Sequence, residues 1–313
     1  MALTINTNIS SLIAQRNLNS ATNALNTSIE RMTTGYKINR SADNAAGYSI
    51  ANMWVTQLSS IDVASDNAAT GADMLTTTED TYSLLSSHLQ RIRDLTEQAS
   101  NGTYGSQSLK AMQSEIEARL EEINRIVANS EFNGIKLMDG TGVGTSGVNL
   151  QVGLYGEANS CINLAQSLFA DATICGLFAG ALNQVKKVDS TIDKLNTNLT
   201  QFAAACVGLK KDGTNYIIAD NLKANEMLTH IDNAIKEISE RTTKIGAAQN
   251  KVESAITALD VQSQNITSSL STLRDTDIAE ESSNYIQAQI LQQASATLLS
   301  TANQLPSIAL NLI

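Results

Sequence analysis

Residues 228–273 read LTHIDNAIKEISERTTKIGAAQNKVESAITALDVQSQNITSSLSTL, and this stretch decides the fold that the sequence predicts. Apolar residues recur in it every seven positions without a break, a spacing typical of a coiled coil. A strict repeat of seven also implies a left-handed supercoil around a partner. A lone helix would not be stable, because ordering its backbone costs more free energy than burying one apolar stripe contributes. The members of this seam are Ile231, Ile238, Ile245, Val252, Leu259, Ile266 and Leu273.

A second stretch near the amino terminus has the properties of the missing partner. Between residues 47 and 100 apolar residues again lie seven apart, and this seam matches the first in period and length. We therefore predict a mainly α fold built on a long antiparallel coiled-coil rod, each helix about 70–80 Å long at 1.5 Å per residue. The second seam consists of Trp54, Ile61, Ala68, Leu75, Tyr82 and Leu89.

Composition agrees with a rod and argues against several classes of protein. Of the 313 residues, 42% are apolar but only 4% are aromatic, and Pro306 is the single proline. A net charge of −10 argues against a nucleic-acid-binding protein, which needs basic residues to neutralise phosphates. Residues 1–15 lack the pattern of a cleaved signal peptide, and no apolar run is long enough for a membrane span. These rules predict a cytoplasmic protein or one exported without a cleaved signal.

The two ends of the chain share an unusual pattern. Residues 1–29 contain one charge, Arg16, and residues 282–313 contain none, yet apolar residues recur in both at helical spacing. A helix without charges is expected to meet protein on its polar face as well, where a charge would be costly to bury. We predict terminal assembly helices that become ordered on association, with the following apolar positions: Leu12, Leu18, Leu25, Leu291, Leu298, Leu305 and Leu312.

Shorter signals divide the rest of the chain. Gly35 should end the first helix, and Ser41 or Asp43 should cap the second. Asn101-Gly102 should separate the second helix from a third, which carries an i,i+4 pair from Glu121 to Arg125. Alternation from Phe132 to Val152 predicts a small β-hairpin.

The region from 161 to 220 is predicted to be a helical central insert. Three- and four-residue spacings favour an amphipathic helix from about 181 to 211, ended by Lys210, Lys211 and Gly213. Cys206 lies on its apolar stripe and is expected to be a buried core residue. Because this stripe closes locally, the insert should be dispensable for assembly.

The sequence contains no recognisable set of catalytic, metal-binding or disulfide-forming residues. His88 and His230 stand alone, and Cys161, Cys175 and Cys206 form no CxxC pair, so neither a metal site nor a disulfide framework is indicated. No nucleophile, base or cofactor loop is recognisable. We therefore predict a protein that is not an enzyme and needs no cofactor.

Several motifs together resemble those of bacterial flagellins. The resembling segments are RMTTGYKINRSADNAAG at 31–47, Asn133-Gly134, LQVG at 150–153 and ANQLPSIALNLI at 302–313. The resemblance covers residues 1–160 and 221–313. It implies an inner core domain formed by 1–42 and 274–313, a rod domain formed by 43–160 and 221–273, and a variable outer insert at 161–220.

This resemblance implies a structural subunit that polymerises with its copies into the bacterial flagellar filament for motility. It further implies export as an unfolded chain, an extracellular location, and contacts with an export chaperone and with cap and junction proteins. Arg91, Leu95 and Glu115 match the patch by which flagellins are sensed by the vertebrate Toll-like receptor for flagellin. The alternative interpretation is that these three residues only stabilise contacts between subunits.

Two other functions remain open from the sequence. A hook–filament junction protein resembles flagellins at both ends, although it is not expected to match residues 90–95 and 132–134 as well. A coiled-coil signalling module would use the same heptads, but normally has a membrane span or sensor domain. Filaments formed in precipitating salt would favour the flagellin interpretation.

Overall fold

The computed structural model describes residues 8–143, 147–178, 203, 206, 209–212, 215–218 and 221–311. The described chain is mainly helical, as predicted, and forms two compact units, one of residues 1–60 with 261–313 and one of residues 61–260. The helices are α1 (Ile9–Thr34), α2 (Ala45–Ser100), α3 (Ser106–Asn129), α4 (Ile174–Leu177), α7 (Asn221–Arg274) and α8 (Ile278–Asn311). The strands are β1 (Glu131–Phe132), β2 (Ile135–Lys136), β3 (Val148–Gln151), β4 (Cys161–Leu164), β5 (Leu209–Asp212) and β6 (Asn215–Ile218).

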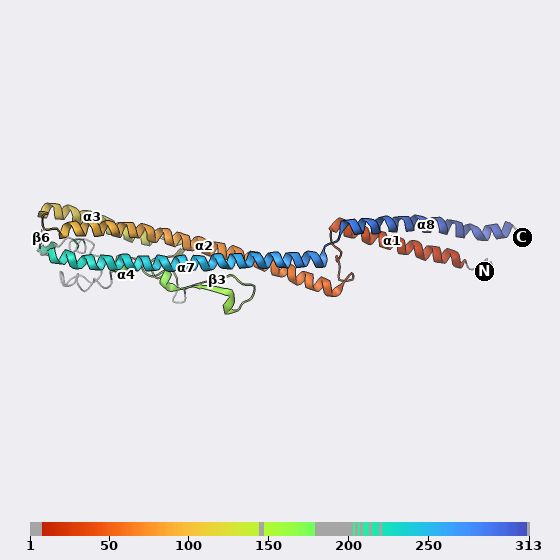
Figure 1. Cartoon of the computed structure of the whole chain (residues 1–313), viewed down its shortest axis with the longest axis horizontal. Helices are drawn as coiled ribbons and strands as arrows, with labels where there is room; N and C mark the ends of the chain where they lie inside the picture. The colour runs from red at the N-terminus through yellow and green to blue at the C-terminus, as the bar shows by residue number, and fades with distance from the viewer. Residues whose placement is uncertain are drawn as a thin grey trace. The chain divides into compact units, whose positions relative to one another are not determined.

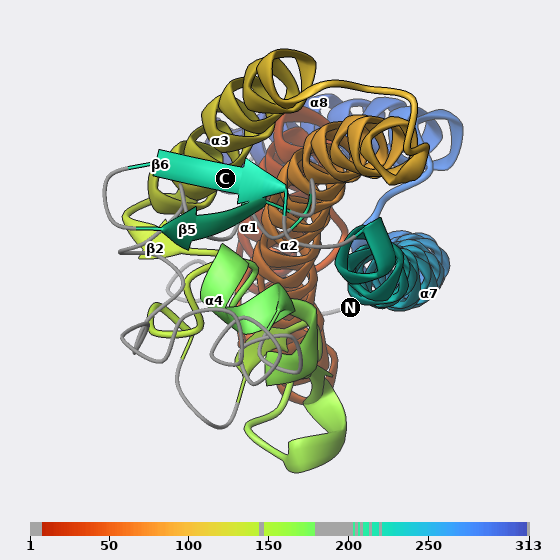
Figure 2. The ribbon, with the colours of Figure 1, turned by 90° about the vertical axis from the view of Figure 1, so that its left-hand side faces the viewer.

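The unit of residues 61–260 is a helical bundle whose core contains most residues of both heptad seams. α3 runs beside α2 (Figure 1, Figure 2) and adds a third apolar stripe. Trp54, Ile266 and Leu273, which lie in the other unit, are only half-buried. The seam residues buried in the bundle are Ile61, Ala68, Leu75, Tyr82 and Leu89 from α2 and Ile231, Ile238, Ile245, Val252 and Leu259 from α7.

The small β-hairpin predicted from Phe132 to Val152 is present as β1 and β2, but the run that begins at Val148 is not part of it. β1 and β2 flank a two-residue loop in which Asn133 and Gly134 have φ of 49° and 79°. β3 pairs with β4, in the register Val148↔Leu164 to Gln151↔Cys161, and not with the first hairpin. Alternation of apolar residues identifies a strand, but it does not say which strand is the partner.

The segment after β4 belongs to the bundle core, although the expected insert begins at residue 161. The Tyr82 hydroxyl donates to the carbonyl of Leu168 (3.1 Å), and Arg241 Nη1 donates to the carbonyls of Ala170 (3.0 Å) and Asp171 (3.2 Å). These bonds satisfy a guanidinium that is almost fully buried between the helices. The buried apolar side chains of the segment are Leu164, Leu168, Phe169, Ala172, Ile174, Leu177 and Phe178.

Most of the helix predicted at 181–211 lies outside the described residues. Ala203 and Cys206 are helical and fully buried. The predicted helix end at Lys210 and Lys211 is wrong, because β5 pairs there with β6. The β-branched and aromatic run at residues 216–218 supplies a strand partner, and strand pairing overrides the intrinsic helix propensity of the lysines.

Two local predictions are also corrected. Asn44, and not Ser41 or Asp43, caps α2, since its side-chain oxygen accepts from the Gly47 N–H (2.9 Å). The predicted pair of Glu121 with Arg125 is replaced by a pair of Arg125 with Glu122 at 2.5 Å. In the part of the chain that the structure describes, no helix is long and apolar enough to cross a membrane.

Candidate assembly surface

α1 and α8 form an antiparallel helix pair in the unit of residues 1–60 and 261–313 (Figure 1). Asn8 caps α1 by accepting from the Ser11 N–H (3.1 Å), and Gly35, with φ of 77°, ends it. Polar side chains join the helices, among them Gln292 Nε2 to Thr22 Oγ1 (3.2 Å) and Ser11 Oγ to Asn303 Oδ1 (2.7 Å). The pair is therefore aligned in one register along its length.

Small side chains form the contact between these two helices. The buried residues lie seven apart on each helix, so they share one face per helix. Small residues allow helix axes to approach closely, but each buries little apolar area. The seam consists of Ala14, Ala21 and Ser28 on α1 and of Glu281, Ala288, Ser295 and Ala302 on α8.

The large apolar residues of the pair point away from this seam. Leu12 is 61% exposed, Leu291 51% and Leu298 60%, while Leu18 and Leu25 are half-buried. The side chains of Leu305 and Leu312 lie outside the described residues. Large apolar residues that are exposed in such number on one helix pair point to an interaction site. Further exposed members are Ile9, Ile13, Ile29, Ile278, Ile286 and Ile290.

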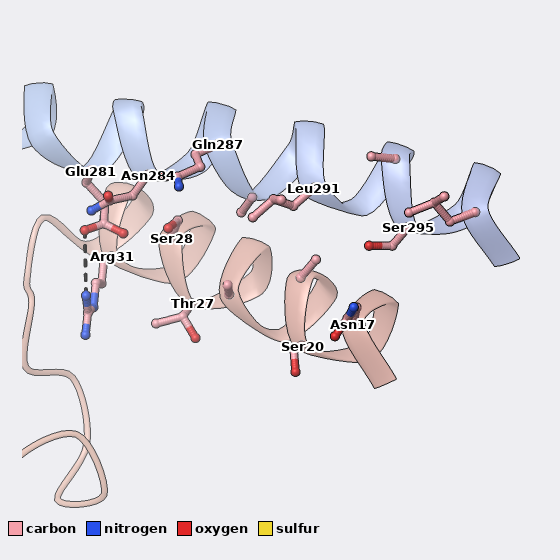
Figure 3. A pocket seen from close by; sticks show the side chains of 15 residues that line it. Asn17, Ser20, Thr27, Ser28, Arg31, Glu281, Asn284, Gln287, Leu291 and Ser295 are labelled. Carbon is pink, nitrogen blue, oxygen red and sulfur yellow. Dashed lines mark ion pairs between the residues drawn. The ribbon is translucent and has the colours of Figure 1, made fainter. Parts of the chain in front are cut away.

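A groove of about 800 Å³ runs between α1 and α8 (Figure 3). Alanine, serine and asparagine side chains line it, with Leu291 and Leu298 among the lining residues. An ion pair lies at one end, where Arg31 Nη1 is 3.7 Å from Glu281 Oε2. The Glu281 side chain is only 6% exposed, so Arg31 compensates a carboxylate that would otherwise be buried without a counter-charge.

The segments that follow α1 and precede α8 are also joined. The Lys37 N–H donates to the Arg274 carbonyl (2.7 Å) and the Thr276 N–H to the Gly35 carbonyl (2.9 Å). Between these bonds the Arg274 guanidinium stacks on the Tyr36 ring, 4.1 Å from its centroid. This junction fixes the end of α1 relative to the beginning of α8.

The residues that match the flagellin receptor patch lie on the bundle, and the structure brings two of them together. Arg91 Nε is 2.9 Å from Glu115 Oε1, and both side chains are exposed. The hydrogen bond from Arg91 holds the pKa of the Glu115 carboxyl below its usual value. Leu95 is 3% exposed and therefore belongs to the core and not to the surface.

The groups capable of chemistry are few in the described part of the chain. Among these residues, no three His, Cys, Asp or Glu side chains lie close enough to hold a metal ion. Burial raises the pKa of the Cys206 thiol to about 12, so it is an unreactive core residue. Long seams and an exposed apolar helix pair thus define a helical protein built for packing against other protein surfaces.

Comparisons with known proteins place this architecture in one family. The model of the bacterial flagellin N-terminal helical region matches residues 5–142, and that of the C-terminal helical region matches residues 228–313. Flagellin B of Vibrio cholerae is 30% identical over 382 aligned positions covering both chains completely. Flagellin C of the same species is 31% identical over 379 positions, also with complete coverage.

Solved structures add a comparison of the fold. A putative flagellar hook-associated protein from Vibrio parahaemolyticus is similar with a TM-score of 0.54 and 15% identity, covering 74% of this chain and all of that chain. The chain belongs to the bacterial flagellin family. It is a structural subunit that polymerises with its copies into the flagellar filament, an extracellular appendage, and it is not an enzyme.

Sequence reasoning found only the α8 part of the small-residue seam. The small residues that flank the heptad leucines of α8, among them Ala288 and Ala302, indicate that another helix can approach closely, but Ala14, Ala21 and Ser28 were not recognised as the face toward α8. The recurrence of small residues every seven positions was the available signal, and on α8 it includes Ala288 and Ala302. Leucines also lie seven positions apart on both helices, and they drew attention away from the small residues.

Proposed function

We propose that subunits pack in the filament through the exposed apolar faces of α1 and α8. The observation that carries this proposal is the inversion of side-chain size, with small residues inside the pair and large ones outside. A soluble helix pair normally buries its large apolar residues. Leu12, Ile290 and Leu298 therefore contribute most once a neighbouring subunit covers them.

These apolar residues occupy more than one face of the pair. On a helix with 3.6 residues per turn, Ile286 and Ile290 lie on the side of α8 opposite the seam residue Ala288, while Leu291 and Leu298 border the groove. A subunit with apolar surface on several sides makes different contacts on each, and such head-to-tail contacts generate open helical assemblies. The groove of one subunit and the outer face of α8 that carries Ile286 and Ile290 in another subunit are thus complementary candidates for one contact.

We further infer that the chain is exported unfolded through the flagellar secretion channel and meets an export chaperone and the cap and junction proteins. Its membership of the flagellin family supports this inference. The weak seam of α1 and α8 agrees with ends that become ordered only on assembly, when neighbouring subunits offset the ordering cost.

The test places one charge on the proposed surface. Leu298→Lys should abolish filament formation in precipitating salt, because the contact would bury an unpaired ammonium. Leu298→Met, which conserves volume and apolarity, should still form filaments. Sedimentation and electron microscopy report both results, and normal filaments from the lysine variant would contradict the proposal. Failure of the unaltered chain to form long filaments would instead favour a hook–filament junction protein.

We also propose that Arg91 and Glu115 form a surface read by the vertebrate Toll-like receptor for flagellin. Their exposed ion pair, which joins α2 to α3, supports a rigid, accessible patch, and Leu95 contributes to the core. Arg91→Ala should remove a charge-assisted contact of about 1.5–3 kcal/mol and lower signalling by the monomer about tenfold or more. Arg125→Ala, which breaks another exposed pair on α3, should leave signalling unchanged. Equal signalling from both folded variants would refute a receptor role.

A further inference from the structure

The chain contains two Asn-Gly pairs, Asn101-Gly102 and Asn133-Gly134. This dipeptide is chemically labile, because the backbone nitrogen of a glycine is not shielded by a side chain and can reach the side-chain carbonyl carbon of the preceding asparagine. The product is a five-membered ring. Since such a ring is almost flat, it closes only if the asparagine backbone can rotate to bring these two atoms together.

The structure holds Asn133 away from that geometry. Asn133 and Gly134 form the loop of the β1–β2 hairpin, and their positive φ values of 49° and 79° are those of a type I′ turn. In this turn the Gly134 nitrogen lies on the opposite side of the asparagine backbone from its side chain. The hairpin is further closed by the ion pair of Lys136 with Glu131 (2.8 Å) and by the Leu137 N–H donating to the Ser130 carbonyl (3.1 Å).

Asn101 lies under much weaker restraint. It follows the last residue of α2, and Asn101, Gly102 and Thr103 are all exposed. Its backbone N–H donates to the Gln98 carbonyl (3.1 Å), and its carbonyl accepts from Thr103. Among the described residues, neither its side-chain amide nor the Gly102 N–H has a hydrogen-bond partner. No strand pairing has to open before the backbone rotates.

We propose that Asn101 is a site of spontaneous deamidation in the folded protein, whereas Asn133 is protected by its hairpin. The Gly102 nitrogen loses its proton to hydroxide and attacks Cγ of Asn101. A bond forms between these atoms, the C–N bond of the side-chain amide breaks, and ammonia leaves. Water then opens the ring at either carbonyl and yields aspartate or isoaspartate. One water is consumed and one ammonia released, so the conversion requires no oxidant or enzyme.

The conversion would change the end of α2 in two ways. It places a negative charge beside the carboxyl end of a helix, where the backbone dipoles already present negative charge. Isoaspartate also lengthens the backbone by one carbon in the short connection between Ser100 and Ser106. Asn101→Asp reproduces the charge without the longer backbone, so it separates the two effects.

The test follows both asparagines in the same full-length chain. The purified protein is incubated in mildly alkaline buffer, and peptide mass spectrometry measures the exchange of amide for carboxylate at each site over time. Opening the hairpin breaks at least one more net hydrogen bond than opening the turn, so Asn101 should convert about tenfold faster than Asn133, or more.

An unfolded control shows whether the fold causes this difference. In concentrated guanidinium chloride both sites precede glycine without structural restraint, so their rates should converge. Gly102→Ala should slow conversion at Asn101 in the folded chain, because a methyl group shields the attacking nitrogen, and should leave Asn133 unchanged. Comparable rates at the two sites in the folded protein, or faster conversion at Asn133, would overturn the proposal. A rate difference that persists after unfolding would also overturn it.

Discussion

The β3–β4 hairpin packs against α2 at Gly71. A methyl group there would overlap the Leu150 side chain of β3, and Asn67 Nδ2 donates to the Gln151 carbonyl (3.3 Å) beside it. Gly71→Ala should therefore destabilise the bundle by about 1–3 kcal/mol, as overpacking of a tight contact does. Urea denaturation followed by circular dichroism measures the change.

Gly246 provides the matched control on α7. Nothing lies within 4 Å of the methyl group that alanine would add there, and the residue is inside a helix. Gly246→Ala should stabilise the protein by about 0.5–1 kcal/mol, because glycine loses more backbone entropy than alanine on helix formation. If both substitutions stabilise the protein, Leu150 is not seated on Gly71 in solution.

Cys206 and Cys161 should differ in their contributions to stability. Cys206 is fully buried, whereas Cys161 is half-buried and donates from Sγ to Gln151 Oε1 (2.8 Å). Cys206→Ala should cost about 1 kcal/mol for the lost contacts and cavity, and Cys161→Ala should cost less. Thermal unfolding of both variants measures this, and equal melting temperatures would contradict the burial of Cys206.

Because the Cys206 thiol can ionise, the difference in stability between the unaltered chain and Cys206→Ala depends on pH. Burial raises the pKa of Cys206 to about 12 from an ordinary value of 9.0. The folded state keeps the thiol neutral while the unfolded chain ionises, so its contribution to stability is complete below pH 9 and is lost between about pH 9 and 12. The stability gap between the unaltered chain and Cys206→Ala should shrink across that interval.

Long periodic elements could be predicted from the sequence, because a repeat sustained over many turns has few alternative explanations. The seams that contain Ile61 and Ile231 each predict a helix, the face of that helix that is buried and the partner against which it packs. The cap at Asn44 and the pairing of β3 with β4 could not be predicted, since each depends on which of several competent neighbours lies closest in space. The role of Ala14 and Ala21 was missed for a related reason, because close approach of α8 makes small residues the contact.

The limits of the insert can now be tested on two deletions. Replacing residues 161–220 by a short glycine linker removes β4 and the buried Phe169 and Phe178, so this chain should fail to fold. Replacing only residues 179–200 keeps those side chains and the buried Cys206, and we predict that this chain still forms filaments. Circular dichroism and electron microscopy distinguish the outcomes. A folded, polymerising chain from the larger deletion would show that the segment from 161 to 178 is dispensable.

Removing both ends of the chain separates folding from assembly. A fragment of residues 41–274 keeps the whole unit of residues 61–260 and lacks α1 and α8. It should remain folded and soluble, and limited proteolysis of the intact monomer should stop near these limits, since weakly held ends are cleaved first. The fragment should not polymerise at any salt concentration. Normal filaments from it would exclude the terminal helices as the assembly surface.

The alanine and serine seam of α1 and α8 has a consequence for how stability should be described. Because the pair buries little apolar area by itself, the proposed contacts with other subunits would supply most of the free energy that holds it. The melting temperature of the pair should then depend on protein concentration and rise with it by mass action. The unit of residues 61–260, whose large residues are already inside, should melt at the same temperature whether the solution is dilute or concentrated.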